Sequence, residues 1–234
     1  MSTPTPARIT ALLPMKAHSE RIPEKNFRDF NGRPLFRWVL DTLLSVPAIG
    51  RVVINTDAVK ELRAAGLESG GRVLIRERRP EIRGDMVSMN RIIEDDIAAV
   101  QSDVYLMTHT TNPLLSVATI EGALAAFANA RAAGTHDSLF TVNRIQTRFY
   151  RADGSAINHD PDNLVRTQDL EPWFEENSNL YLFTRDSFAA TAARIGKRPL
   201  LYPTPRREST DIDTPEDWDF AIVAARHYVE NNRR

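Results

Sequence analysis

ITALLPMKAHSERIPEKNFRDF, residues 9–30, is the stretch on which both the fold and the chemistry of this chain depend. Residues 9–14 form an apolar run that is typical of a buried strand. After Pro14 the chain becomes polar and cationic, then turns at Asn31-Gly32 and enters an amphipathic helix at Pro34. Open α/β sheets build phosphate sites from this succession of strand, cationic loop and helix. We therefore expect an α/β protein that binds an anion in this loop.

The composition excludes several classes of protein. The 234 residues are enough for one α/β domain with a substantial core. The 30 Lys+Arg and 31 Asp+Glu residues leave a formal net charge of −1, which argues against nucleic-acid or membrane partners. The chain has no cysteine, so disulfides and thiolate metal sites are excluded. No apolar run approaches the ~18 residues of a membrane span, and residues 1–8 lack an apolar signal region, so we expect a cytoplasmic protein.

The rest of the chain alternates between buried strands and amphipathic helices. We expect further strands at 51–57, 72–76, 103–108, 138–142 and 200–203, and helices at 58–65, 89–100, 117–132, 185–193 and from Pro215. The pattern weakens between residues 144 and 177, where Asp153-Gly154, Pro161 and Pro172 are turn signals. A loop this long in a compact domain is usually functional.

The second strong signal is the acidic stretch STDIDTPED, residues 209–217. In an extended segment Asp211 and Asp213 share one face, while Ile212 points into the core. Strand geometry places their Cα atoms about 6.6 Å apart, so two carboxylates can converge on one hard cation such as Mg²⁺. Aspartates near a helix start are more often caps or surface charges. Here Asp217 already occupies the capping-box position relative to Thr214, so Asp211 and Asp213 are available for another role, such as binding a cation.

Three common catalytic motifs do not occur in the sequence. The phosphate-loop pattern GxxxxGK[ST] is missing, as is GxGxxG after a strand, which disfavours Walker-type ATPases and dinucleotide oxidoreductases. The GxSxG elbow of α/β hydrolases is missing too.

The spacing of the opening loop resembles the acylneuraminate cytidylyltransferase family, or CMP-sialic acid synthetases, whose relatives are the CMP-KDO synthetases. Ser19, Pro23, Lys25 and Asn26 match the family pattern R-x-x-S-K-x-x-P-x-K-N, with Lys16 in place of the arginine and Glu20 in place of the lysine. Similar matches occur at Thr56-Asp57, at 85–88, at 109–114, at 177–183 and in the stretch DIDTPED. The resemblance therefore covers nearly the whole chain.

The resemblance implies a fold and an organisation. It implies one domain over residues 1–234, a Rossmann-like three-layer sandwich with a mostly parallel sheet, of the nucleotide-diphospho-sugar transferase type. It also implies that residues 144–177 form a small β-rich insert that covers the sugar site and makes the contact of a homodimer.

The resemblance also implies roles for individual residues. Lys16, Lys25, Asp211 and Asp213 would be catalytic, with Asp211 and Asp213 holding Mg²⁺. The nucleotide-binding residues would be Lys16, Ala17, Ser19, Lys25, Asn26, Arg76 and Ser88. The sugar-binding residues would be His109, Asn112, Arg166, Gln168, Asn177 and Tyr181. We expect Arg78 and Arg79 to be solvated, while Ser88 and Asp57 could equally be helix caps.

The implied reaction joins CTP to an acidic sugar. The anomeric hydroxyl of a sialic, legionaminic or pseudaminic acid would attack the α-phosphorus of CTP and release pyrophosphate. Lys16, Lys25 and backbone N–H groups near Ala17 and Ser19 would hold the phosphates. Two alternatives stay open: transfer to another sugar such as KDO, and a nucleotide-sugar-binding protein without turnover. The second alternative stays open because the chain departs from the family pattern at four residues: Lys16, Glu20, His109 and Ser178. At the position of Ser178 the family has glycine.

Overall fold

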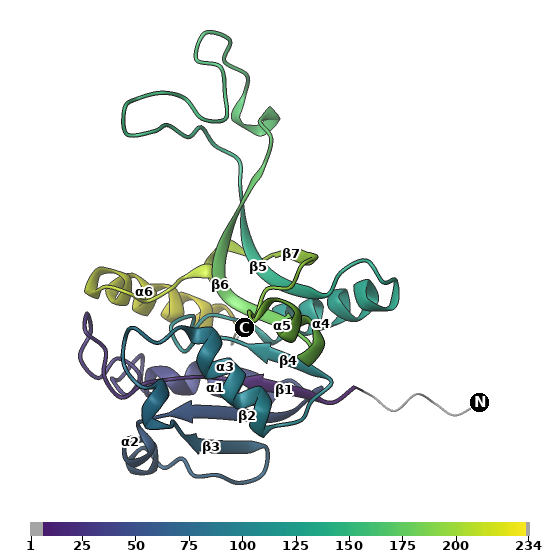
Figure 1. The fold of residues 1–234 in the computed structure, drawn as a ribbon. Coiled ribbons are helices and arrows are strands. Elements are labelled where there is room, and N and C mark those ends of the chain that lie inside the picture. The colour runs from purple at the N-terminus through teal and green to yellow at the C-terminus, as the bar shows by residue number, and fades with distance from the viewer. Residues whose placement is uncertain (1–6, 233–234) are drawn as a thin grey trace.

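A seven-stranded sheet forms the centre of the molecule, in the order β3-β2-β1-β4-β6-β5-β7 (Figure 1). The computed structural model describes residues 7–232. Its strands are β1 (Ile9–Leu12), β2 (Ile49–Thr56), β3 (Val73–Glu77), β4 (Val104–Met107), β5 (Ser138–Ile145), β6 (Trp173–Phe183) and β7 (Pro199–Pro203). Neighbouring strands are parallel except at β6, which runs antiparallel to β4 and β5. The predicted mostly parallel sheet is confirmed.

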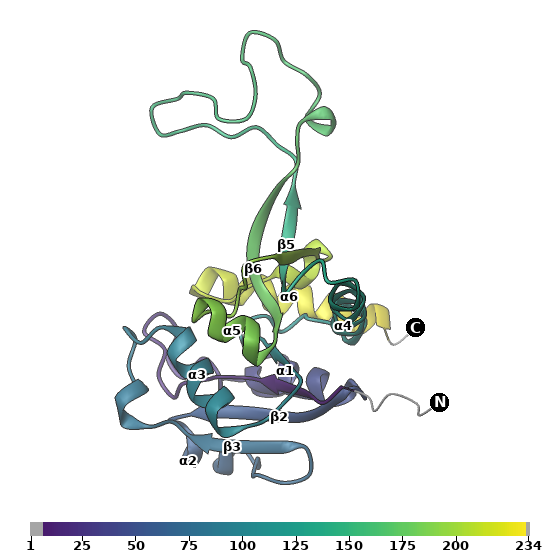
Figure 2. The same cartoon turned by 45° about the vertical axis from the view of Figure 1, so that its right-hand side comes forward.

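Helices cover both faces of this sheet, as Figure 2 shows from a second side. The α-helices are α1 (Leu35–Ser45), α2 (Val59–Ala64), α3 (Met89–Ala99), α4 (Val117–Ala132), α5 (Arg185–Thr191) and α6 (Pro215–Asn232). Apolar side chains of α1, α2 and α4 pack on one face, and those of α3 and α5 on the other. Adjacent strand residues divide between these clusters, as Ala11 and Leu12 do, because side chains alternate across a strand. This arrangement is the expected three-layer sandwich.

The strand order places a topological switch point between β1 and β4. From β1 the chain winds outward through β2 to β3, then returns to β4 on the other side of β1. The loops that leave the carboxyl ends of β1 and β4, residues 13–34 and 108–116, therefore diverge from adjacent strands. Ligands of open α/β sheets bind at such a point.

A third apolar cluster joins the opening loop to the end of the chain. Ile22 and Phe30 of the loop pack with Trp38 of α1, with Ile212, and with Trp218 of α6. The Phe30 ring meets Trp218 edge-on at a centroid distance of 5.3 Å. This cluster holds the acidic stretch against the cationic loop.

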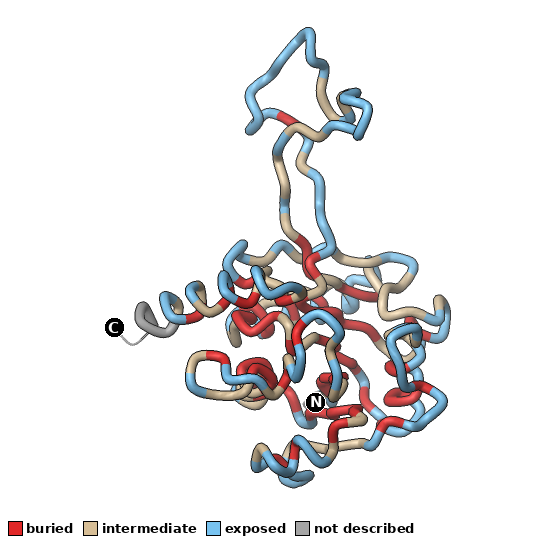
Figure 3. The backbone as a smooth tube through the Cα atoms, turned by 90° about the vertical axis from the view of Figure 1, so that its left-hand side faces the viewer, coloured by how far each residue is buried: buried red, intermediate tan, exposed pale blue. Residues whose placement is uncertain are grey.

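Strands β5 and β6 continue beyond the sheet as a two-stranded ribbon that carries residues 146–172 away from the body (Figures 1 and 2). We call residues 144–177 the arm. Most of the arm outside the ribbon is exposed (Figure 3). The expected β-rich insert is wrong for residues 146–172, where the regular structure consists of the bridge between Tyr150 and Ala156 and the 3₁₀ turn Thr167–Asp169. The β structure of the arm is confined to the two-stranded ribbon at its base.

The predicted elements agree closely with the structure. The expected helix at 117–132 is observed at those bounds, and the other expected elements end within a few residues of the observed ones. The main element without a prediction is β6, because its first half lies in the stretch where the periodicity weakens. Among the described residues, no helix is both long and apolar enough to cross a membrane.

We expect Trp218→Ala to lower the free energy of unfolding by about 3–5 kcal/mol, because it empties the centre of the third cluster. Phe220→Ala is the matched control on the same helix, since Phe220 is 66% exposed whereas Trp218 is 3% exposed. We expect Phe220→Ala to change the free energy of unfolding by no more than about 0.5 kcal/mol. Urea unfolding measures both. Equal losses in the two variants would contradict the proposed importance of this cluster.

Candidate active site

The opening loop is held in shape by hydrogen bonds to the two strands beside it. The Asn26 amide donates to the Lys16 carbonyl at 2.8 Å and accepts from the Thr110 hydroxyl at 2.6 Å, which ties the loop to the end of β4. The Ala17 N–H donates to the Asp57 carboxylate at the end of β2, at 2.8 Å. The predicted phosphate contact of the Ala17 N–H is therefore in conflict with the structure, because Asp57 already occupies this donor.

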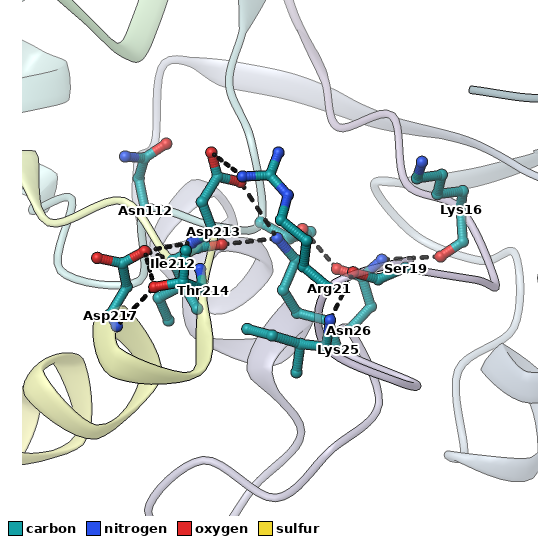
Figure 4. Close-up of polar contacts among 12 residues, drawn as sticks. Lys16, Ser19, Arg21, Lys25, Asn26, Asn112, Ile212, Asp213, Thr214 and Asp217 are labelled. Carbon is teal, nitrogen blue, oxygen red and sulfur yellow. Dashed lines mark hydrogen bonds and ion pairs between the residues drawn. The ribbon is translucent and has the colours of Figure 1, made fainter. Parts of the chain in front are cut away.

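Lys25 brings the loop to the acidic stretch. Its ammonium group donates to the Ile212 carbonyl at 2.6 Å and lies 3.7 Å from Asp213, while Arg21 lies 3.3 Å from the same carboxylate (Figure 4). The Lys25 side chain is 12% exposed. Burial lowers the pKa of Lys25, and the carboxylates of Asp213 and Asp211 offset part of this shift. The predicted cationic and acidic groups thus face each other.

The acidic stretch is fixed to the loop after β4. The Ile212 N–H donates to the Thr111 carbonyl at 2.9 Å, and the Asn112 amide donates to the Thr210 carbonyl at 3.4 Å. Ile212 is fully buried, as the alternation of side chains predicts. The Thr214 hydroxyl accepts from the Asp217 N–H at 3.2 Å, and the Asp217 carboxylate accepts from the Thr214 N–H at 2.7 Å. The predicted capping role of Asp217 is confirmed.

One of the two predicted metal ligands, Asp211, has an oxygen without a hydrogen-bond partner. Oxygen Oδ1 of Asp211 is buried and accepts no hydrogen bond, so it is an orphaned acceptor that a cation would satisfy. Burial raises the pKa of Asp211, and a smaller rise comes from the charge of Asp213. Within residues 7–232 there is no group of three or more acidic, histidine or cysteine side chains that could hold a metal. Mg²⁺ suits such a site because it is usually bound by one or two carboxylates together with substrate phosphates and waters.

A cavity of about 280 Å³ opens at the switch point. Its walls combine the opening loop, the loop after β4, the segment before α3, and Asp213. Residues with predicted roles among them are Lys16, Ser19, Lys25, Asn26, His109 and Asp213. Larger cavities lie beside β3 and beside the amino end of β1, but they do not reach the carboxyl ends of β1 and β4. Chemistry rather than volume therefore identifies the candidate site.

The structure reverses the predicted roles of two arginines. Arg76, expected at the nucleotide, is bound to Asp95 at 2.9 Å and to Asp96, and it does not line the cavity. Arg78, expected in solvent, is 4% exposed and lines the cavity. Its guanidinium donates to the backbone carbonyls of Met15 at 3.1 Å and Asn55 at 2.8 Å. Arg79, in contrast, has a 64% exposed side chain.

Two other residues with predicted nucleotide contacts, Lys16 and Ser88, already have partners within the protein. Lys16 forms an ion pair with Asp85, whose carboxyl pKa this contact lowers. The Ser88 hydroxyl accepts from the Asn90 N–H at 3.3 Å, so the capping alternative describes this residue in the structure. Its neighbours Val87 and Met89 line the cavity.

The predicted sugar-binding residues do not all meet at the cavity. His109 lines it, but Asn112 is fully buried. The Asn177 amide nitrogen donates to Asn143, Thr204 and Ser209, and so ties the arm base to the segment after β7. Tyr181 is fully buried, and its hydroxyl contacts Glu176, Ser178 and Arg194.

Arg166 and Gln168 lie on the arm, which projects from the body of the molecule (Figure 1), and neither lines the cavity of its own chain. The Arg166 side chain is 73% exposed and pairs with Asp169 at 2.7 Å. The Gln168 carbonyl accepts from the Gln146 amide at 2.8 Å. Within one chain these two residues therefore do not meet the other predicted sugar-binding residues.

Comparisons with known proteins find similarity over most of this chain. A family model described as cytidylyltransferase matches residues 10–209. A pseudaminic acid cytidylyltransferase of Campylobacter jejuni is 23% identical over 220 residues, which cover 91% of this chain and 94% of that protein. CMP-N,N'-diacetyllegionaminic acid synthase of Legionella pneumophila is 27% identical over 231 residues, which cover 90% of this chain and 93% of that protein.

Among solved structures, the fold is similar to a CMP:2-keto-3-deoxy-manno-octonic acid synthetase complexed with CTP. The TM-score is 0.67 at 16% identity, and the match covers 95% of this chain and 100% of that one. A 4-diphosphocytidyl-2C-methyl-D-erythritol synthase of Anaerococcus prevotii gives a TM-score of 0.69 at 13% identity, over 94% and 96% of the two chains. These matches confirm the predicted nucleotide-diphospho-sugar transferase fold.

The environment of His109 generates a prediction about pH. Burial, and to a lesser degree the charges of Arg194 and Lys25, lower the pKa of the His109 imidazole to about 3 from its ordinary value of 6.5. The unfolded chain therefore takes up a proton at His109 below pH 6.5, whereas the folded chain does not, so folding stability decreases as pH falls. Between about pH 7.5 and about pH 5.5 this effect should cost the wild type about 1 kcal/mol.

We expect His109→Gln to remove this share of the pH dependence, measured by urea unfolding at both pH values. His136→Gln is the control, because it replaces a half-buried histidine that does not line the cavity. A His109→Gln variant whose stability falls between the two pH values as much as that of the wild type would contradict a neutral His109 imidazole in the folded chain.

Proposed function

Since this chain belongs to the cytidylyltransferase family, we propose that it transfers CMP from CTP to the anomeric hydroxyl of an acidic α-keto sugar and releases pyrophosphate. The observation that carries this proposal is the meeting of Lys16, Lys25 and Asp213 in one cavity at the switch point of the sheet. Nucleotidyl transfer needs cations for a triphosphate and a carboxylate site for the accompanying metal ion. The sugar class follows from the relatives named for pseudaminic and legionaminic acid.

On the nucleotide side, Lys16 and Lys25 would neutralise phosphate oxygens. Lys25 is positioned for this task because the Ile212 carbonyl and Asp213 fix its ammonium group. Arg78 keeps the start of the loop in place through the Met15 carbonyl. As the sugar hydroxyl bonds to the α-phosphorus and the bond to the departing pyrophosphate breaks, these fixed cations stabilise the negative charge that moves to the leaving group.

On the acidic side, Asp211 and Asp213 would hold Mg²⁺. When bound, Mg²⁺ neutralises phosphate charge and lowers the pKa of a coordinated hydroxyl. The role of the chain is to present the two carboxylates: Ile212 is anchored in the core between them, and the capping box of Thr214 and Asp217 fixes where α6 begins. The buried Oδ1 of Asp211, which accepts no hydrogen bond, supports this assignment.

We further propose that the arm pairs two copies of the chain into a homodimer. The arm exposes an unusual number of large apolar side chains, namely Tyr150, Ile157, Leu164, Val165, Trp173 and Phe174. Clustered exposed apolar groups on a projecting element are typical of an interface. In such a dimer Arg166 and Gln168 could contact a sugar in the partner's cavity, which would reconcile their predicted role with their place on the arm.

The test of the proposed reaction is pyrophosphate release from CTP and Mg²⁺ with a panel of acidic sugars: sialic, legionaminic and pseudaminic acids, and KDO. We expect release with at least one nine-carbon acid. Release with KDO alone would select the other sugar class. Binding of CTP without release with any sugar would contradict catalysis and favour a nucleotide-binding protein.

We expect Asp213→Asn to abolish release, by at least about 10²-fold, because it removes a ligand of the metal that offsets phosphate charge. Its thermal unfolding should stay cooperative, because the Asp213 side chain is half-exposed. Glu216→Gln, which neutralises a nearby exposed carboxylate, is the control and should keep wild-type turnover. Wild-type turnover in Asp213→Asn would remove the metal assignment.

For the arm, we expect the double variant Leu164→Glu with Phe174→Glu to sediment as a monomer, since it places charges on the exposed apolar surface. Val223→Glu changes an equally exposed apolar residue on α6 and is the control. Sedimentation velocity of the three proteins decides the question. A monomeric wild type, or a double variant that stays dimeric, would contradict this interface.

A further inference from the structure

The two lysines that line the cavity are held in different ways. The Lys25 side chain is 12% exposed and donates to the Ile212 carbonyl, so one of its partners belongs to the main chain. The Lys16 ammonium group forms an ion pair with the Asp85 carboxylate, and these side chains are 43% and 49% exposed. Lys16 and Asp85 both line the cavity. Because an exposed ion pair contributes little free energy, Lys16 can exchange its partner whereas Lys25 is fixed.

The main chain at Lys16 is fixed even though its side chain can change partner. The Lys16 carbonyl accepts from the Asn26 amide at 2.8 Å. The carbonyl of the preceding residue, Met15, accepts from the Arg78 guanidinium at 3.1 Å. Neither contact involves Asp85. Separation of the ion pair would therefore change what the Lys16 ammonium group binds and leave the shape of the opening loop intact.

Asp85 lies on a short exposed segment between two anchored residues. Before it, the Arg83 guanidinium donates to a main-chain carbonyl at 2.8 Å. After it, Ser88 is the N-cap of α3. Between these anchors Gly84 has φ +100° and the Met86 side chain is 98% exposed, so little packing holds the segment. The Asp85 carboxylate can therefore leave Lys16 and return to it without disturbing buried residues.

The proposed reaction requires a way to release pyrophosphate. When the bond to the α-phosphorus breaks, pyrophosphate keeps the electron pair and carries more negative charge than the same two phosphates carried in CTP. Cations that stabilise this charge as it develops also bind the product that carries it. Product release limits the turnover of many enzymes. A site with fixed cations alone would therefore retain pyrophosphate.

We propose that Asp85 promotes the release of pyrophosphate by taking Lys16 back from it. This inference rests on the proposed function. Binding of CTP transfers Lys16 from Asp85 to a phosphate, and after the bond breaks the same carboxylate competes for Lys16 again. This competition weakens the binding of CTP and of pyrophosphate alike. CTP has its nucleoside for further contacts, whereas pyrophosphate depends on its phosphate contacts, so the product is the ligand that leaves.

A second carboxyl group favours the return of Lys16 to Asp85. Glu20 lies beside Asp85 and also lines the cavity. The family pattern has lysine at this position, so the chain carries a negative charge here in place of a positive one. When Lys16 leaves Asp85, two carboxylates face each other without the cation that separated their charges. Their repulsion raises the free energy of the separated state.

The experiment measures the binding of pyrophosphate to the full chain by titration calorimetry in the presence of Mg²⁺. We expect Asp85→Asn to bind pyrophosphate about 5-fold more tightly than the wild type, because Lys16 loses its competing partner. The inhibition constant of pyrophosphate against CTP should fall by the same factor. Quenched-flow should show a burst of CMP-sugar in Asp85→Asn, because release then limits turnover.

Two control variants isolate the ion pair. Glu20→Gln removes a carboxylate from the same cavity but leaves the partner of Lys16 in place, so we expect pyrophosphate affinity to change by no more than about 2-fold. Asp103→Asn breaks an ion pair of similar exposure, that with Arg8 at the amino end of β1, where the Asp103 side chain is 45% exposed. We expect Asp103→Asn to keep the wild-type affinity for pyrophosphate.

Three outcomes would overturn the proposal. They are an unchanged pyrophosphate affinity in Asp85→Asn, an equal gain in Glu20→Gln, which would indicate general charge repulsion, and a tighter Asp85→Asn without a burst. Asp85 is half-exposed, so we expect a wild-type Tm for Asp85→Asn; if this variant does not fold, Asp85→Ser replaces it. A wild type that binds neither CTP nor pyrophosphate overturns the proposed function itself, which distinguishes that failure from this one.

Discussion

The nearly buried ammonium group of Lys25 is the constraint on which the site depends. Its two partners, the Ile212 carbonyl and the Asp213 carboxylate, come from a segment 187 residues further along the chain. A buried cation without partners is strongly destabilising. The opening loop can therefore keep its shape only when the acidic stretch is docked against it. The cluster around Phe30, Ile212 and Trp218 supplies the apolar contacts that make this docking favourable.

The same contacts give the cavity its electrostatic character. Asp213 is shared between Arg21 and Lys25, so both poles are largely neutralised before any ligand arrives. Asp211 remains incompletely satisfied, because burial has removed water from an oxygen that accepts no hydrogen bond. A chain with a net charge of −1 can therefore bind a polyanion, because its cationic side chains are clustered at the opening loop even though the charges of the whole chain nearly cancel.

Local patterns explain which features could be predicted from the sequence. Helix and strand positions follow from hydrophobic periodicity, and the inward Ile212 with the capping box of Thr214 and Asp217 follows from spacing within a few residues. The roles of Arg76 and Arg78 could not be predicted, because Asp95 and Asp96, which bind Arg76, lie on another element.

The ion pair between Lys16 and Asp85 has a consequence for how the free enzyme meets the small anions of a cell. Asp85 acts as a tethered competitor: it occupies the lysine that is proposed to meet a phosphate, and both side chains are partly exposed and free to separate. A monovalent anion that replaces the Asp85 carboxylate gains little binding free energy, because Lys16 exchanges one negative charge for another. A multiply charged triphosphate would engage Lys16, Lys25 and the proposed metal ion together, so the loop would discriminate by valence as well as by shape.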